Sequence, residues 1–199
     1  MRYNLVRKNV QSFSKQVCML IYDDKLRTNQ AQQQAIDEAI RTAQFIRNKC
    51  LRKWMDERGI GDNDLQVYCS QLATDFPFAA LLNSQAHQTS ADRAWLSIAR
   101  FYKNCREQKP GKKGYPRFQH DNRSVEYKAT GWKLEPDGKR ITFTDGMGIG
   151  TMRLIGKKRK LKPIPSSRSS GSGWSNAPMA IMCSLRSGTP VLKHGACRG

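Results

Sequence analysis

The spacing of apolar residues changes once along the chain, and this change constrains the fold more than any other feature. Between Asn29 and Cys105, apolar residues recur at steps of three and four, as on the buried face of helices. After Ser124 they alternate in short segments, as in half-buried strands. A compact apolar run over residues 17–22 suits a buried strand. We therefore expect an α+β fold, in which a helical segment is inserted into a small antiparallel β-sheet or partial barrel.

Local signals place the boundaries of these elements. Asn29 is a suitable N-cap for the first helix, and Gly59 follows the expected end of that helix. Pro77 should end a second helix, and the turn sequence at 135–139 predicts a hairpin. The further expected elements are helices over 63–73 and from about 83 to 105, and strands over 125–129, 132–134, 141–144 and 152–155.

One apolar stripe on each long helix is interpreted as core. On the third helix it consists of Ala86, Ser90, Ala94, Ile98, Phe101 and Cys105, with Trp95 and Tyr102 beside it. Stacking of bases on the aromatic rings of this stripe is the alternative. On the first helix, the opposite face is polar and is interpreted as solvated, with contact to phosphates as the alternative; it carries Arg41, Gln44, Arg47 and Arg52.

The chain divides into four segments on this basis. Residues 1–28 form an N-terminal arm and the first strand, 29–120 a helical segment that ends in a basic loop, and 121–156 an antiparallel β segment. Residues 157–199 are basic and rich in Ser and Gly, and we expect this tail to be disordered.

The composition of the tail is unusual in a second way, because no acidic residue follows Asp145, although ten Lys and Arg do. A flexible basic arm is one interpretation of the tail, and a frameshift between about residues 156 and 170 is another.

The charge of the chain points to a polyanionic partner. Thirty-five Lys and Arg against sixteen Asp and Glu give a net charge of +19. This balance attracts nucleic acid. No apolar run approaches the roughly 20 residues of a membrane-spanning helix, and no signal peptide precedes the first strand. We expect a cytoplasmic protein that binds DNA or RNA and no membrane.

The densest basic stretch joined to ordered structure covers residues 100–118, where Glu107 is the single acid. Cations there can bind phosphates, and the interleaved aromatic rings can stack on bases. The candidate nucleic-acid-binding residues are Lys103, Arg106, Lys109, Lys112, Lys113, Tyr115, Arg117 and Phe118.

Motifs for catalysis, metals and cofactors are absent from the sequence. The six cysteines include no C-x-x-C pair, and the three histidines are isolated, so reduced thiols without metal are expected. The glycines from Gly146 to Gly150 lack the Lys and Thr or Ser of a P-loop. We expect neither catalytic residues nor a cofactor.

The order of elements, together with one motif, resembles the N-terminal half of the OrfB or TnpB-type transposon proteins, a family of RNA-guided nucleases. The first helix has the Gln-rich start and later aromatic and Asn positions of that family, here 32–34 and 45–48. The basic stretch ends in the family's Gly-aromatic-Pro-Arg-Phe signature, here residues 114–118. The resemblance covers about residues 17–155.

The resemblance implies a wedge-type β-barrel interrupted by a helical recognition insert that grips guide RNA and a target duplex. It also implies that the first strand pairs with the sheet after Ser124. The residues that it places in contact with RNA and DNA are Lys103, Lys109, Lys112, Lys113 and Arg117.

The family's nuclease half is missing from this sequence. That half has a ribonuclease-H-like domain with three separated acids and a zinc ribbon of paired C-x-x-C motifs. Phosphodiester cleavage with two metals needs such carboxylates. The sequence therefore predicts a truncated, non-catalytic, nucleic-acid-binding portion of a transposition protein. An independent RNA- or DNA-binding module, ribosome-associated or regulatory, is the alternative; the preference for RNA or DNA and the oligomeric state stay open.

Overall fold

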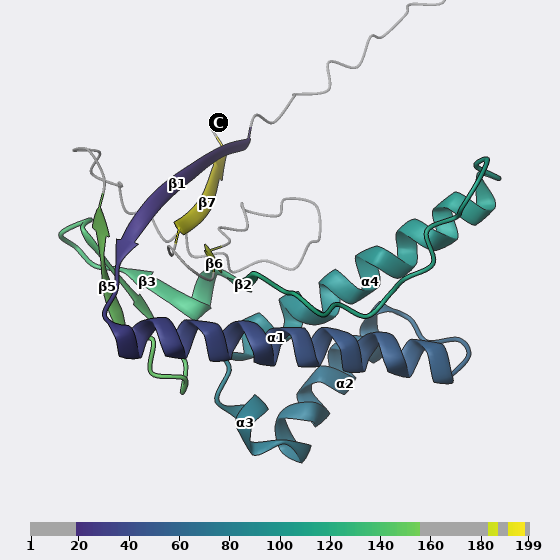
Figure 1. The fold of residues 1–199 in the computed structure, drawn as a ribbon, viewed down its shortest axis with the longest axis horizontal. Helices are drawn as coiled ribbons and strands as arrows, with labels where there is room; N and C mark the ends of the chain where they lie inside the picture. The colour runs from purple at the N-terminus through teal and green to yellow at the C-terminus, as the bar shows by residue number, and fades with distance from the viewer. Residues whose placement is uncertain (1–18, 156–182, 187–190, 198–199) are drawn as a thin grey trace, which may run out of the picture.

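The computed structural model describes residues 19–155, 183–186 and 191–197. In Figure 1 a sheet occupies one end and the helices extend from it. The helices are α1 (Gln30–Asp56), α2 (Asp62–Asp75), α3 (Pro77–Ala80) and α4 (Ser84–Arg106), with a 3-10 turn η1 (Ala129–Gly131). The strands are β1 (Met19–Arg27), β2 (Ser124–Tyr127), β3 (Trp132–Leu134), β4 (Arg140–Phe143), β5 (Thr151–Ile155), β6 (Cys183–Arg186) and β7 (Val191–Cys197). All four helices lie between β1 and β2 in the chain, so the expected α+β fold with a helical insert is confirmed.

Asparagine side chains cap the starts of the two long helices, and the cap at Asn29 was predicted. The Asn29 side chain accepts a hydrogen bond of 2.8 Å from the N–H of Gln32, whose side chain in turn accepts one of 3.2 Å from the N–H of Asn29. At α4, the Asn83 side chain accepts a 2.8 Å bond from the N–H of Gln85. These bonds satisfy amides at the helix N-termini that have no partner within the helix.

Pro77 ends α2 as expected, but it also begins the four-residue helix α3. The missing N–H of a proline is no loss at the first position of a helix, where intrahelical partners are lacking anyway. This short helix was not predicted, because the proline was interpreted only as a helix breaker.

The strands form one antiparallel sheet in the order β2-β6-β7-β1-β5-β4-β3. The hairpin of β3 and β4 is confirmed: the N–H of Glu135 donates to the carbonyl oxygen of Arg140 at 2.9 Å, and Gly138 has a φ of 63°. The first strand pairs with the later sheet as expected, with Lys25 opposite Ile155. It continues to Arg27 because β5 supplies a partner for its last residues.

Within the tail over 157–199, for which the sequence predicts disorder, the structure describes residues 183–186 and 191–197. These form β6, which pairs with β2, and β7, which pairs with β1. The unpaired N–H and C=O groups of β1 and β2 can bind any strand with the right geometry, so the Ser- and Gly-rich composition did not exclude pairing. The basic run at 157–160, the rest of the tail and residues 1–18 lie outside the described residues.

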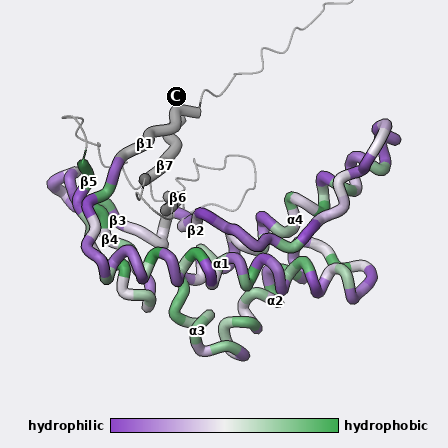
Figure 2. Tube along the Cα trace, in the orientation of Figure 1, coloured by the Kyte–Doolittle hydropathy of each residue, from purple (hydrophilic) through white to green (hydrophobic). Residues whose placement is uncertain are grey.

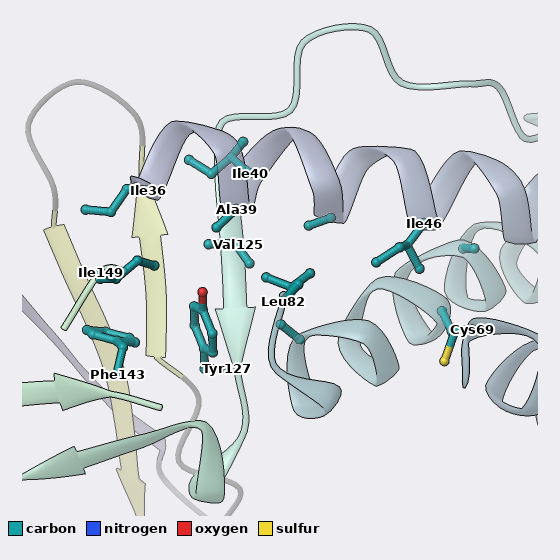
Figure 3. Packing of buried hydrophobic residues seen from close by; sticks show 14 of the residues in the cluster. Ile36, Ala39, Ile40, Ile46, Cys69, Leu82, Val125, Tyr127, Phe143 and Ile149 are labelled. Carbon is teal, nitrogen blue, oxygen red and sulfur yellow. The ribbon is translucent and has the colours of Figure 1, made fainter. Parts of the chain in front are cut away.

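One continuous core joins the sheet to the helices. In Figure 3, Val125, Tyr127, Phe143 and Ile149 face one another beside the first half of α1. The rings of Tyr127 and Phe143 meet edge to face at 5.1 Å between centroids. The core continues past Leu82 into the space between the helices, where Ile46 and Cys69 lie.

α1 is attached to the sheet by a side chain as well as by its apolar face. The amide nitrogen of Gln32 donates to the carbonyl oxygens of Ile149 and Thr151, each at 3.0 Å. The same side chain caps the helix through its oxygen. α1 therefore begins at a fixed place on the sheet and leads away from it.

Candidate nucleic-acid interface

The predicted binding residues lie at the end of the molecule opposite the sheet. α4 carries the chain outward, and residues 107–123, here called the basic loop, turn at its end and return toward β2 (Figure 1). The turn and the returning segment are mostly hydrophilic in Figure 2. The basic loop has no helix or strand of its own, so its shape depends on contacts with α1 and α4.

Three side-chain amides of the two long helices hold this loop. Asn48 binds both backbone groups of Gln119: its oxygen accepts from the N–H at 2.9 Å, and its nitrogen donates to the carbonyl oxygen at 2.8 Å. One turn earlier on α1, the side-chain oxygen of Gln44 accepts from the N–H of Asn122 at 2.8 Å. On α4, the nitrogen of Asn104 donates to the carbonyl oxygen of Lys113 at 3.0 Å.

Aromatic rings make a further contact between loop and helices. Tyr115 lies 5.7 Å from Trp54 and 5.2 Å from Phe101, measured between ring centroids. Trp54 is also 5.8 Å from Tyr102, and its indole N–H donates to the Tyr102 hydroxyl at 2.9 Å. We call Trp54, Phe101, Tyr102 and Tyr115 the aromatic cluster. Tyr102 is 49% exposed and Tyr115 is 54% exposed.

The structure brings the predicted residues together on α4 and the basic loop. Lys103 and Arg106 lie in the last turn of α4, and the other six lie in the basic loop. Pro116, within the signature, is buried, whereas Phe118 is 37% exposed. All eight are exposed except Lys113, which is half-buried and whose ammonium contacts the carbonyl oxygen of Lys109.

Little negative charge offsets these cations. Glu107 lies 3.7 Å from the ammonium of Lys103 and 3.4 Å from that of Lys109. One carboxylate is thus shared by two lysines and neutralises at most one charge. Among the described residues, no carboxylate lies within 4 Å of Lys112, Lys113, Arg106 or Arg117.

The polar face of α1 has mixed roles. Arg41 pairs with Glu38 at 3.2 Å, and Arg52 pairs with Asp56 at 2.8 Å, both on the surface. Arg47 is half-buried, and its pKa is lowered by burial and by the nearby cation of Arg93. The solvated interpretation therefore fits Arg41 and Arg52, whereas Gln44 on the same face holds the basic loop.

Sequence reasoning missed several residues of this surface. Tyr102 was interpreted as core, with base stacking as the alternative, and Trp54 was not identified as part of this surface; neither was linked to the loop. Cys105, assigned to the apolar stripe of α4, is exposed because α4 continues past α1 and α2 there. The Gln44 and Asn48 pair, spaced by one helical turn, was a signal for a polar contact along one line of α1.

The described ranges contain neither a cluster of metal ligands nor a membrane-spanning helix. No three or more His, Cys, Asp or Glu side chains there gather as metal ligands would. No helix in those ranges combines the length and the apolar character needed to cross a membrane.

Comparison with known proteins gives no match, either to a protein-family model or to a curated protein.

Proposed function

We propose that this chain is the nucleic-acid-binding portion of an OrfB or TnpB-type transposon protein, and that it binds RNA or DNA through the basic loop and the end of α4. The observation that carries the proposal is the group of cations over residues 103–117, which has Glu107 as its single acid and lies on the end of α4 and on a loop that three amides hold in place. Fixed cations bind phosphates with a smaller loss of side-chain and loop entropy than cations on a mobile arm.

The wider role follows from the resemblance. The chain would contact a guide-like RNA and DNA in the cytoplasm as part of a protein for DNA transposition. The proposal assigns no cleavage to this chain, because the acidic residues and paired cysteines of the family's nuclease half are not in its sequence.

A charge-matched pair of variants tests the binding site. The loop variant replaces Lys109, Lys112, Lys113 and Arg117 by Ala. The control variant removes the same charge from the exposed surface of the sheet, at Lys25, Arg27, Lys133 and Lys139. Binding of labelled RNA and DNA is measured by fluorescence anisotropy over a range of salt concentrations.

We expect the loop variant to bind more weakly and to have a smaller salt dependence, because each lost phosphate contact lowers the slope of log K against log salt by about 0.7 to 0.9. The control variant should keep nearly the full slope. Equal losses in the two variants would mean that only net charge matters and would refute the site. Circular dichroism checks that both variants keep their helices.

A further inference from the structure

Building on the proposed function, we infer that the aromatic cluster is a stacking site for an unpaired base, so that the preferred ligand of this surface is a single-stranded nucleic acid. The phosphates on either side of that base would contact the cations of the basic loop.

The exposure of the rings is the first support. Tyr102 comes from α4 and Tyr115 from the basic loop, and both contact the indole of Trp54 on α1, with centroids 5.8 and 5.7 Å away. Each of these tyrosines nevertheless keeps about half of its surface in solvent, at 49% and 54%. The two exposed tyrosine rings, both in contact with the Trp54 indole, offer π-faces on which any of the bases can stack.

The second support is that the rings are held in position. The indole N–H of Trp54 binds the Tyr102 hydroxyl at 2.9 Å. Tyr115 lies between Gly114 and the buried Pro116, and Asn104 binds the carbonyl oxygen of Lys113 at 3.0 Å. A surface that is already ordered loses little entropy when a ligand stacks on it.

Charge selects among the ligands that aromatic rings can take. Lys103 follows Tyr102 directly, and Lys113 and Arg117 lie two residues on either side of Tyr115. These cations repel a quaternary ammonium or methylated lysine, the usual ligands of aromatic cages. They attract the phosphates that accompany a nucleic-acid base. A base within a duplex is already stacked on its neighbours, so an unpaired base fits best.

The test compares two single strands that differ only in their bases. One is an oligothymidylate of about 12 nucleotides, and the other is an abasic strand with the same number of phosphates. For the full chain we expect the oligothymidylate to bind about ten-fold tighter than the abasic strand. It should also bind tighter than a duplex of the same length.

Variants then assign the preference to the cluster. Replacing both Tyr102 and Tyr115 by Leu should remove the ten-fold difference, so that the variant binds the two strands with equal affinity; a preference that persists in this variant would refute the assignment to the cluster. Replacing both by Phe retains the rings and should retain the preference. Phe78→Leu is the matched control, because it removes a ring of similar exposure, 43%, from α3.

Failure of this inference is distinguishable from failure of the proposed function. Equal affinity of the full chain for the two strands, with binding still lost in the Ala variant of the basic loop, would refute stacking and leave the proposed function standing. Binding that does not respond to the loop variant would refute both. The comparison of strands on the unaltered chain can refute stacking even if the Leu variant fails to fold, and the Phe variant, which retains the rings, then tests the cluster beside the Phe78→Leu control.

Discussion

The side-chain amide of Asn48 pairs with both backbone groups of Gln119, at 2.8 and 2.9 Å, and so joins the middle of α1 to the returning half of the basic loop. These two hydrogen bonds satisfy the N–H and C=O groups of Gln119, which in a sheet would bind a neighbouring strand. A loop without regular structure thereby has a fixed path over α1 toward β2.

Asn48→Ala should loosen the basic loop without changing its charge. Two exposed hydrogen bonds are lost, each contributing about 0.5 to 1.5 kcal/mol. We expect faster amide hydrogen exchange at Gln119 and Asn122 and affinity for nucleic acid that is weaker by a few-fold. The salt slope should not change, because no cation is removed.

The control for this variant is Asn63→Ala, which changes an exposed asparagine on α2. Exchange at Gln119 that stays as slow as in the unaltered chain would show that Asn48 does not hold the loop.

His87 stabilises the junction of α2, α3 and α4. It is 3% exposed, and its ring nitrogens lie 3.1 Å from the carbonyl oxygen of Cys69 and 2.8 Å from that of Ala79. The Ala79 oxygen also accepts from the N–H of Leu82 at 3.1 Å, so His87→Leu removes a hydrogen bond without leaving that oxygen unpaired. We therefore expect the free energy of unfolding to fall by about 0.5 to 1.5 kcal/mol. Urea unfolding followed by circular dichroism measures this. The exposed His120 is the control, and an equal effect of His120→Leu would contradict the explanation.

The Asp145 carboxyl should make stability depend on pH. Burial raises its pKa above the ordinary value of 3.8, while hydrogen bonds from the Tyr127 hydroxyl and from the N–H groups of Met147 and Ile149 lower it in part. The folded state thus binds this proton more readily than the unfolded state. The stability from this group is full below pH 3.8 and is lost as the pH rises through the raised pKa.

Asp145→Asn removes this titration and keeps an oxygen that can accept from Tyr127. Urea unfolding over a pH series should show that the variant gains stability relative to the unaltered chain as the pH rises. Asp75→Asn, at the end of α2, is the control. A difference between variant and unaltered chain that stays constant with pH would refute the role of Asp145.

The cysteines should differ sharply in reactivity. Burial raises the pKa of Cys50 to about 12 and that of Cys69 to about 11, and the reactive form is the thiolate. Cys105 is exposed near the end of α4. Mass spectrometry after brief alkylation should find Cys105 labelled and the other two protected until the chain unfolds. Nucleic acid bound at the end of α4 should slow the labelling of Cys105. Rapid labelling of Cys50 in the folded chain would contradict the burial argument.

Local patterns were sufficient for much of the secondary structure. Asn29 predicted where α1 begins, because capping depends on residues within three positions of one another. The turn sequence at 135–139 predicted its hairpin, because the conformation of a turn also depends on a few neighbouring residues. In contrast, α3 depended on how the chain continues after Pro77, and β6 and β7 on sheet edges more than fifty residues away.

The candidate site divides in the same way. Its cations and its signature at 114–118 are close together in the chain, so the sequence alone determined that a concentrated basic stretch lies at the end of α4 and directly after it. Only the tertiary structure decided that Asn48 holds this stretch, and that Trp54 meets Tyr102 and Tyr115. The number of charges in a stretch can be counted directly from its sequence. The contacts of Asn48 with Gln119 and of Trp54 with Tyr115 depend instead on how α1, α4 and the loop pack, which the spacing of nearby residues does not encode.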